Sequence, residues 1–336
     1  MIAELPAQLT YSSDDDPGIT RKGAGRGFAF YDASGELIRD EELRERLLAL
    51  AIPPAYTKVW YCPDPNGHLQ ATGFDSRGRK QYRYHPLWSE HQSRKKFNSL
   101  IDFGEALPRL RRSITHHIAK DDLSRDHVLA TVARLLDKTA ARVGNDHYFE
   151  ENGTTGLTTL RKKNVDVTGK RVELSYTAKG GEEREFDLYQ PRLASIIDEL
   201  QELPGQRLFK YRSDAGWIAV DSGKINAWLK ERAGLDITAK DFRTWRASAL
   251  TLEFLVGCPA ANSKKERISQ EMEALRETSR ELGHRPPVCR KHYVHPLILD
   301  HHRDGKLATA ARAAPVVKGL SEMEARLFNF LKLHTL

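Results

Sequence analysis

Cysteine is scarce in this chain, and long uncharged apolar runs are absent. Among 336 residues there are three cysteines, Cys62, Cys258 and Cys289, which lie far apart and never in a C-x-x-C spacing. This usage supports neither a disulfide framework nor a zinc ribbon, and it fits a reducing compartment. No stretch approaches the ~18–20 apolar residues of a membrane span. The N-terminal segment also lacks the basic and then apolar order of a signal peptide, so we expect a cytoplasmic protein without a membrane partner.

Motifs for nucleotide hydrolysis and metal catalysis are missing as well. The sequence contains no P-loop, no G-x-S-x-G and no H-E-x-x-H. Residues 23–27 are glycine-rich, but their spacing is G-x-G-x-G and we expect no strand before them, so we interpret them as a flexible loop. A group of C-terminal histidines lacks the carboxylates or cysteines of a metal site. These histidines are His292, His295, His301 and His302.

The charge is weighted toward basic residues and is unevenly distributed. The chain has 53 Lys+Arg against 46 Asp+Glu, a net charge of +7. Residues 1–90 carry 11 basic and 13 acidic side chains, whereas residues 77–138 carry 14 basic and 7 acidic ones. A nucleic acid bound along this basic region fits the distribution. A solvated lysine- and arginine-rich surface fits it equally well.

The hydrophobic periodicity changes along the chain. Residues 28–84 show short alternating runs separated by Gly and Pro, interrupted by a helical pattern at residues 41–50, which predicts a small sheet-based domain. From residue 89 on, the period is mainly helical. One helix, which includes the apolar positions 128–136, is expected to end near Gly144 as its C′ glycine.

Two further patterns complete the second half. Alternating apolar residues between positions 165 and 188, divided by two glycine-containing turns, predict a three-stranded antiparallel meander. The spacing Ser321-x-x-Glu324 is a capping box that predicts a final amphipathic helix. We therefore predict an α+β protein, with a small β-rich domain of antiparallel sheet and short helices at 1–90 and a larger, mainly α-helical domain at 91–336.

Separate segments of the second domain carry residues suited to phosphate chemistry. They are Arg142 near the expected helix end, Lys179 in the turn 178–181, Arg243 within Lys240-x-x-Arg243-Thr244, His284 after Gly283, and Tyr293 nine residues later. Each of these residues alone is weak evidence for a catalytic site, because an arginine at a helix end usually interacts with the helix dipole and a turn lysine usually faces solvent. In this order and spacing they resemble the type IB DNA topoisomerases, specifically the poxvirus-like branch found in bacteria.

The resemblance extends over nearly the whole chain. Residues 52–56 (Ile-Pro-Pro-Ala-Tyr) and 78–84 (Gly-Arg-Lys-Gln-Tyr-Arg-Tyr) are similar to the family's N-terminal domain, whose strand reads DNA in the major groove. The resemblance implies that residues 1–90 bind DNA and that residues 91–336 are catalytic. Strand alternation puts Tyr82 and Tyr84 on one face, although half-buried tyrosines would show the same pattern. The implied DNA-binding residues are Arg79, Lys80, Gln81, Tyr82, Arg83 and Tyr84.

The resemblance also implies a mechanism. Tyr293 would attack a DNA phosphodiester and keep the 3′ phosphate while a 5′ hydroxyl leaves, although a free phenol ionises only near pH ~10. Arg142 and Arg243 would hold the non-bridging oxygens, because a guanidinium stays charged and can bond two oxygens at once. His284 would donate another hydrogen bond, and Lys179 would protonate the leaving oxygen. The family's chemistry implies no metal, no ATP and no cofactor, and a monomer acting on double-stranded DNA in the bacterial nucleoid.

Two other functions fit parts of the pattern. A tyrosine recombinase shares the transesterification and the helical fold, but recombinases generally show H-x-x-R where this chain has Lys240-x-x-Arg243, and their N-terminal domain is typically helical. A basic protein that clamps duplex DNA through phosphate contacts would bind without a covalent adduct. Within the topoisomerase hypothesis, other residues nearby in the sequence could fill the roles assigned to Lys179 and His284. These neighbours are Lys162, Lys163 and Lys170 for the lysine and His292 for the histidine.

Overall fold

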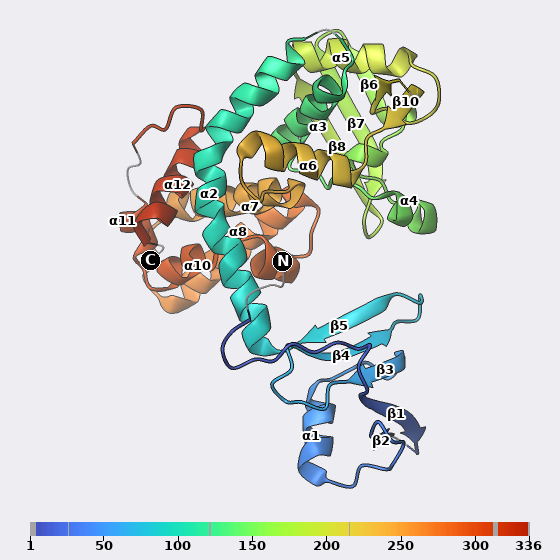
Figure 1. Ribbon diagram of the computed structural model, residues 1–336. Helices are drawn as coiled ribbons and strands as arrows, with labels where there is room; N and C mark the ends of the chain where they lie inside the picture. Colours follow the sequence, from blue (N-terminus) through green and yellow to red (C-terminus); the bar gives the residue numbers. More distant parts are fainter. Residues whose placement is uncertain (1–4, 26, 121, 215, 312–314, 335–336) are drawn as a thin grey trace. The chain divides into compact units, whose positions relative to one another are not determined.

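The computed structural model describes residues 5–25, 27–120, 122–214, 216–311 and 315–334. These residues form two compact units, one ending at Lys96 and the other beginning at Phe97. An antiparallel sheet dominates the first unit, and helices with a three-stranded antiparallel sheet dominate the second (Figure 1). The predicted α+β class is confirmed. The boundary proposed after residue 90 falls inside helix α2 (Pro86–Ile118), and the division between the units lies further along the same helix.

The described residues of the first unit form a five-stranded antiparallel sheet, helix α1 and the start of α2. Its strands run in the order β2-β1-β3-β4-β5, so β5 is an edge strand. Tyr61 packs edge-on against Phe30 inside the unit, with ring centroids 5.6 Å apart. The interpretation of residues 23–27 as a loop with no strand before it is wrong, because Gly23 and Ala24 belong to β1 and Gly27 begins β2. The elements are β1 (Ile19–Ala24), β2 (Gly27–Tyr31), α1 (Glu41–Ala49), β3 (Thr57–Tyr61), β4 (Leu69–Phe74) and β5 (Lys80–Tyr84).

The second unit contains the predicted meander, in the order β6-β7-β8. A two-stranded hairpin, β9-β10, was not predicted, because strands of four residues are too short to show an alternation. After α2 the helices are α3 (Arg125–Thr139), α4 (Asp146–Asn152), α5 (Pro191–Glu202), α6 (Ser222–Ala233), α7 (Ala239–Gly257), α8 (Lys264–Leu282), α9 (Pro286–His292), α10 (Pro296–Arg303), α11 (Leu307–Ala310) and α12 (Glu322–His334), with short 3-10 turns at Leu157–Thr159 and Lys162–Asn164. The strands are β6 (Val165–Thr168), β7 (Arg171–Ala178), β8 (Glu182–Tyr189), β9 (Lys210–Ser213) and β10 (Gly216–Ala219).

The end of helix α3 differs from the prediction. The helix stops at Thr139, and Ala140, not Gly144, adopts the left-handed conformation that caps it, with φ 47°. Gly144 lies beyond the helix with φ 92°, and its backbone packs so closely on Gly156 that a Cβ on Gly156 would lie 2.4 Å from the Gly144 nitrogen. Residues 140–145 are therefore a loop. Arg142 belongs to this loop rather than to the helix end.

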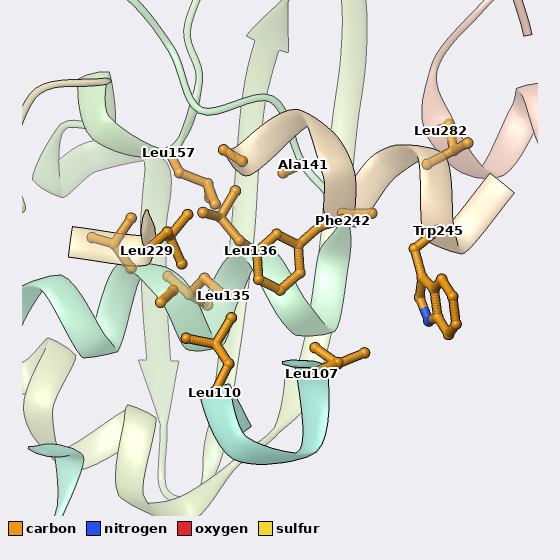
Figure 2. Close-up of a cluster of buried hydrophobic side chains, with 14 of the residues drawn as sticks. Leu107, Leu110, Leu135, Leu136, Ala141, Leu157, Leu229, Phe242, Trp245 and Leu282 are labelled. Carbon is orange, nitrogen blue, oxygen red and sulfur yellow. The ribbon is translucent and has the colours of Figure 1, made fainter. Parts of the chain in front are cut away.

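Helix α3 runs through the centre of the second unit. Its apolar residues Leu135 and Leu136 are fully buried, and Leu107 and Leu110 of α2 lie beside them (Figure 2). Helix α7 contributes Trp245 to the same core, and a Cβ at Gly104 of α2 would lie 2.4 Å from the Trp245 ring. This close packing holds α7 firmly against α2.

A buried ionic network joins four helices beside this core. The guanidinium of Arg111 on α2 bonds Asp137 of α3 and Glu324 of α12, each at 2.7 Å. The indole nitrogen of Trp245 on α7 donates to Glu324 at 3.2 Å. Although burial opposes it, the hydrogen bond from Arg111 keeps the pKa of Glu324 below its usual value. The predicted capping box is confirmed, since Ser321 N–H donates to the same carboxylate at 2.8 Å.

Replacement of Arg111 tests how much this network stabilises the fold. We expect Arg111→Met to lower the free energy of unfolding by about 3–5 kcal/mol, because two buried carboxylates lose their counter-charge. The Asp137 side chain is only 3% exposed. Denaturant titration measures the loss. Arg280→Met is the matched control, since Arg280 pairs with Glu277 on the surface and should cost less than about 1 kcal/mol. Equal losses in the two variants would show that the network contributes little.

Candidate active site

A cavity of about 410 Å³ lies within the second unit. The loop after α3, the β7–β8 turn, the start of α7 and the segment around α9 surround it. The residues predicted as catalytic all line this cavity, although they are spread between positions 142 and 293. The lining consists of Arg142, Val143, Gly144, Asn145, Tyr148, Thr154, Thr155, Lys179, Ala239, Lys240, Arg243, His284, Val288 and Tyr293.

Main-chain carbonyls at two helix ends hold the two arginines. Arg243 donates to the carbonyl of Leu282 at 2.7 Å and to that of Ala140, and Arg142 donates to the carbonyl of Gly283 at 3.0 Å. These carbonyls lie at the C-termini of α8 and α3, where the last carbonyls of a helix lack helical partners and carry partial negative charge. The helix ends therefore stabilise two neighbouring guanidinium groups.

The pKa values of both arginines lie below the usual value of this side chain. Burial is the main cause for Arg243, the charge of Arg142 adds to it, and together they bring the pKa of Arg243 to about 10. Burial also lowers the pKa of Arg142. Both groups stay charged at neutral pH. An anion placed in the cavity would remove part of this electrostatic cost, so the site favours anionic ligands.

His284 lies between the two guanidinium groups. Its Nδ1 is 3.0 Å from Nη2 of Arg142, and its Nε2 is 2.7 Å from Nη2 of Arg243. Burial and then the charges of these two arginines lower the pKa of His284 to about 3, so the ring is neutral at neutral pH. A neutral imidazole has one acceptor nitrogen and one N–H. In one of the two arginine contacts, the imidazole N–H of His284 therefore faces a guanidinium N–H, and the two donors repel each other. A bound ligand oxygen could accept from these N–H groups and remove the repulsion.

The depressed pKa of His284 makes stability depend on pH. Its pKa is about 3 in the folded protein, against 6.5 for a histidine side chain free in water, so protonation favours the unfolded chain between these values. We expect the free energy of unfolding to fall as the pH drops from 6.5 toward 3. His284→Asn cannot titrate, so its stability should fall less steeply over the same range. Denaturant titrations of both proteins at several pH values measure the two slopes, and parallel curves would contradict the assignment.

Tyr293 lies directly against His284. The two rings are stacked, with centroids 4.3 Å apart and planes inclined by 20°. The guanidinium carbon of Arg243 lies 5.5 Å from the centroid of the tyrosine ring. The tyrosine follows the last residue of α9, and its N–H donates to the carbonyl of Cys289 at 2.9 Å. The phenol thus shares one cluster with the histidine and an arginine.

Lys179 occupies the turn between β7 and β8. Gly180 and Gly181 follow it with φ of 92° and 79°, a conformation that favours glycine and makes the tight turn possible. The side chain is exposed and its ammonium group lies 5.2 Å from the centre of the Tyr148 ring. The competing residues do not belong to the lining of this cavity as the described residues define it. These are Lys162, Lys163, Lys170 and His292.

The sequence prediction missed several residues near the site. Tyr148 and Lys240 line the cavity, and Lys240 could have been found because it begins the Lys240-x-x-Arg243 motif. Arg184 of β8 donates to the carbonyl of Arg280 at 3.1 Å, and its charge also helps to lower the pKa of His284. A single arginine in an exposed strand forms no sequence pattern that would predict a place near the site. Its approach to α8 follows only from the tertiary fold.

The predicted DNA-binding residues of the first unit lie on or just before the edge strand β5. Tyr82 and Tyr84 lie on one face, as the alternation predicted, and are 52% and 40% exposed. Their rings are parallel within 10°, with centroids 6.1 Å apart. Arg83 turns the other way, and its Nε donates to the carbonyl of Leu50 at 3.0 Å. The two tyrosines therefore form an exposed aromatic pair.

The remaining polar side chains of this strand bond to aspartates of the same unit. Arg79 pairs with Asp75 at 2.7 Å, and the Gln81 amide donates to Asp75 at 3.1 Å. The hydrogen bond from Arg79 lowers the pKa of Asp75 to about 2. Lys80 pairs with Asp14 at 2.5 Å. A phosphate that these groups bind would compete with the aspartates for their N–H donors.

The C-terminal histidines have local roles in the fold. Nδ1 of His301 is 2.9 Å from the carbonyl of Leu297, and Nε2 of His302 is 3.1 Å from that of Arg267. In the part of the chain that the structure describes, no group of three or more His, Cys, Asp or Glu side chains is arranged to hold a metal ion. Nor does any helix in those residues have the length and apolar character that crossing a membrane requires.

Two family models and several known proteins match this chain. Residues 81–311 match the catalytic core of eukaryotic DNA topoisomerase I, and residues 27–75 match the N-terminal domain of bacterial DNA topoisomerase IB. DNA topoisomerase 1B of Acanthamoeba polyphaga mimivirus is 30% identical over 286 residues, which covers 82% of this chain and 85% of that protein. DNA topoisomerase 1B of vaccinia virus (strain Copenhagen) is 24% identical over 259 residues, which covers 74% and 76% of the two chains.

Both matched families are DNA topoisomerases, so the fold is that of an enzyme of this class. The chain belongs to the type IB DNA topoisomerase family, because the match to the mimivirus protein extends over most of both chains. The resemblance drawn from the sequence motifs is therefore confirmed. The N-terminal match points to the bacterial branch, while the two relatives described above are viral.

Proposed function

We propose that this enzyme relaxes supercoiled duplex DNA by cutting one strand, letting it rotate and sealing it again. The observation that carries the proposal is the gathering of Tyr293, Arg142, Arg243, Lys179 and His284 around one cavity. The cavity offers a nucleophile, two fixed positive charges and a proton donor. Membership of the topoisomerase family favours relaxation over recombination and over simple clamping.

In the proposed first step the phenol oxygen of Tyr293 attacks the phosphorus of a DNA phosphodiester. A bond forms between this oxygen and phosphorus, the phenol proton is released, and the bond from phosphorus to the 5′ oxygen breaks. The 3′ phosphate stays on the tyrosine while the 5′ oxygen takes a proton from Lys179. Religation reverses each of these changes. Since one ester replaces another, the cycle needs no ATP.

The arginines would stabilise the charge that develops on the phosphate. Their N–H groups now bond carbonyls and contact His284, and phosphate oxygens would take over part of these bonds. The Nε–H of Arg243 is buried and has no acceptor among the described residues. With a phosphate bound, His284 can donate its single N–H to an oxygen and accept from one arginine, so the opposition between two N–H groups disappears. These fixed cations would perform the charge neutralisation without a metal ion.

The first unit would bind the duplex through β5. Tyr82, Tyr84 and Gln81 would contact base edges and sugars in the major groove. The basic residues Arg79, Lys80 and Arg83 would exchange their internal partners for phosphates. The exposed tyrosine pair and the positive strand support this assignment. We further propose a monomer that uses no nucleotide cofactor and works on the bacterial nucleoid in the cytoplasm.

A plasmid assay tests the function directly. The wild-type protein is incubated with supercoiled plasmid in EDTA and without ATP. Steady relaxation is expected. Pairwise strand exchange between specific sites would favour a recombinase instead. Salt-dependent binding with no covalent adduct would favour a clamp.

The acid role of Lys179 has its own test. We expect Lys179→Ala to slow cleavage of ordinary DNA by about 10²–10⁴-fold, because an alkoxide leaves poorly without a proton. Replacing the 5′ bridging oxygen by sulfur provides a leaving group that needs no proton, so the variant should lose far less on this substrate. Lys170→Ala, in the other turn of the same sheet, is the control and should cleave both substrates normally. Equal slowing of Lys179→Ala on both substrates would remove Lys179 from this role.

A further inference from the structure

The side chain of Ser248 attaches the main chain around Tyr293 to helix α7. The hydroxyl of Ser248 donates to the carbonyl of Tyr293 at 3.2 Å and accepts from the N–H of His295 at 3.0 Å. Ser248 is fully buried, and it lies on the same helix as Arg243. A single hydroxyl thus contacts the chain immediately before and after Val294.

These two bonds satisfy groups that the neighbouring helices leave open. Tyr293 follows α9 and His295 precedes α10, so the Tyr293 carbonyl and the His295 N–H both lie outside regular helix. A buried main-chain group without a partner is costly, and a hydroxyl can donate and accept at once. Serines and threonines inside helices commonly bond the carbonyl four residues back, as Thr244 bonds Lys240 at 3.3 Å. Both bonds of Ser248 run across to the tyrosine segment instead.

The remaining contacts make this attachment rigid. The N–H groups of Tyr293 and Val294 both donate to the carbonyl of Cys289, at 2.9 and 3.1 Å. Cys289 and Val294 are themselves buried. The backbone of the tyrosine segment is therefore fixed, while the phenol ring is held by its stack on His284.

We propose that Ser248 is a positioning residue, which fixes the backbone of Tyr293 relative to Arg243 so that the phenol oxygen and the guanidinium reach the same phosphorus. The inference rests on the proposed role of Tyr293 as the nucleophile. Misplacement of a reacting group by about 1 Å can cost 10²-fold in rate. Ser248 needs no contact with DNA for this role.

Thr251 provides a matched control on the same helix. Its hydroxyl is also buried, and it bonds the hydroxyl of Thr278 on α8 at 2.9 Å. Thr251→Val therefore removes a buried hydrogen bond of α7 that does not involve the tyrosine segment. The test compares Ser248→Ala, Ser248→Cys and Thr251→Val with wild type. Ser248→Cys keeps the packing but replaces the hydroxyl by a weak donor and acceptor.

The readouts are the single-turnover rate of covalent cleavage, the affinity for uncleaved DNA and the melting temperature. Both Ser248 variants should cleave about 10–100-fold more slowly with unchanged DNA affinity. Thr251→Val should lose melting temperature as Ser248→Ala does and yet cleave within about twofold of wild type. Wild-type cleavage by both Ser248 variants, or equal slowing by Thr251→Val, overturns the inference.

The proposed function and this inference fail in different ways. If Tyr293 is not the nucleophile, wild type forms no adduct at that residue, or Tyr293→Phe cleaves like wild type. If only the role of Ser248 is wrong, wild type forms the adduct at Tyr293, Tyr293→Phe forms none, and the Ser248 variants match wild type.

Discussion

Tyr293→Phe should abolish relaxation of supercoiled plasmid while leaving DNA binding unchanged. The substitution removes one oxygen, which is the atom proposed to bond phosphorus. A phenylalanine ring keeps the stack on His284 and the contact with Arg243, so the cavity should keep its shape. We expect at least about a 10⁴-fold loss, the scale on which a missing catalytic nucleophile reduces an enzyme's rate. Gel analysis of plasmid topoisomers measures it, and a filter-binding titration measures DNA affinity.

A covalent adduct provides the second half of this test. Wild-type protein mixed with DNA and then denatured should carry nucleotide on the peptide that contains Tyr293. The phenylalanine variant should carry none. A variant that still relaxes plasmid, or an adduct on another residue, would contradict the assignment.

Arg243→Met should reduce the cleavage rate by at least about 10³-fold, because it removes a preorganised cationic donor from the charge that develops on phosphorus. The expected effect on stability is small. The lowered pKa of Arg243 shows that the fold disfavours its charge, and an apolar side chain of similar volume avoids that cost. Single-turnover cleavage and denaturant titration measure the two effects.

Arg111→Met makes the same change at an arginine outside the cavity, so the two variants can be compared in stability and in cleavage rate. It should lose stability and keep most of its cleavage rate at temperatures where it is folded. Arg243→Met should behave in the opposite way. If Arg243→Met were destabilised as strongly as Arg111→Met, the guanidinium would have a mainly structural role.

The sequence predicted those parts of the fold that depend on local periodicity. The meander was found because Val172, Leu174 and Tyr176 alternate with exposed residues along a long strand. The capping box ahead of α12 was found because its two residues lie three positions apart. Both signals are contained within a few neighbouring residues.

Features that depend on distant contacts were not predicted. The end of α3 was misplaced because Ala140 takes the left-handed conformation where glycine was expected, and its carbonyl bonds Arg243 on another helix. Motif order named the residues of the cavity, but it gave no indication that helix ends hold the arginines. Ser248 has no sequence signal, since nothing near it in the chain shows that its hydroxyl meets the tyrosine segment.

The stacked arrangement of Tyr293 and His284 between two arginines has a consequence for the enzyme away from its substrate. In the protein without DNA, carbonyls and the imidazole hold the two guanidinium groups, and the phenol ring lies flat against that imidazole. If Tyr293 is the nucleophile as proposed, its phenol must leave this stack before it can attack phosphorus, so we expect the enzyme to cut only where bound DNA draws the ring away from His284.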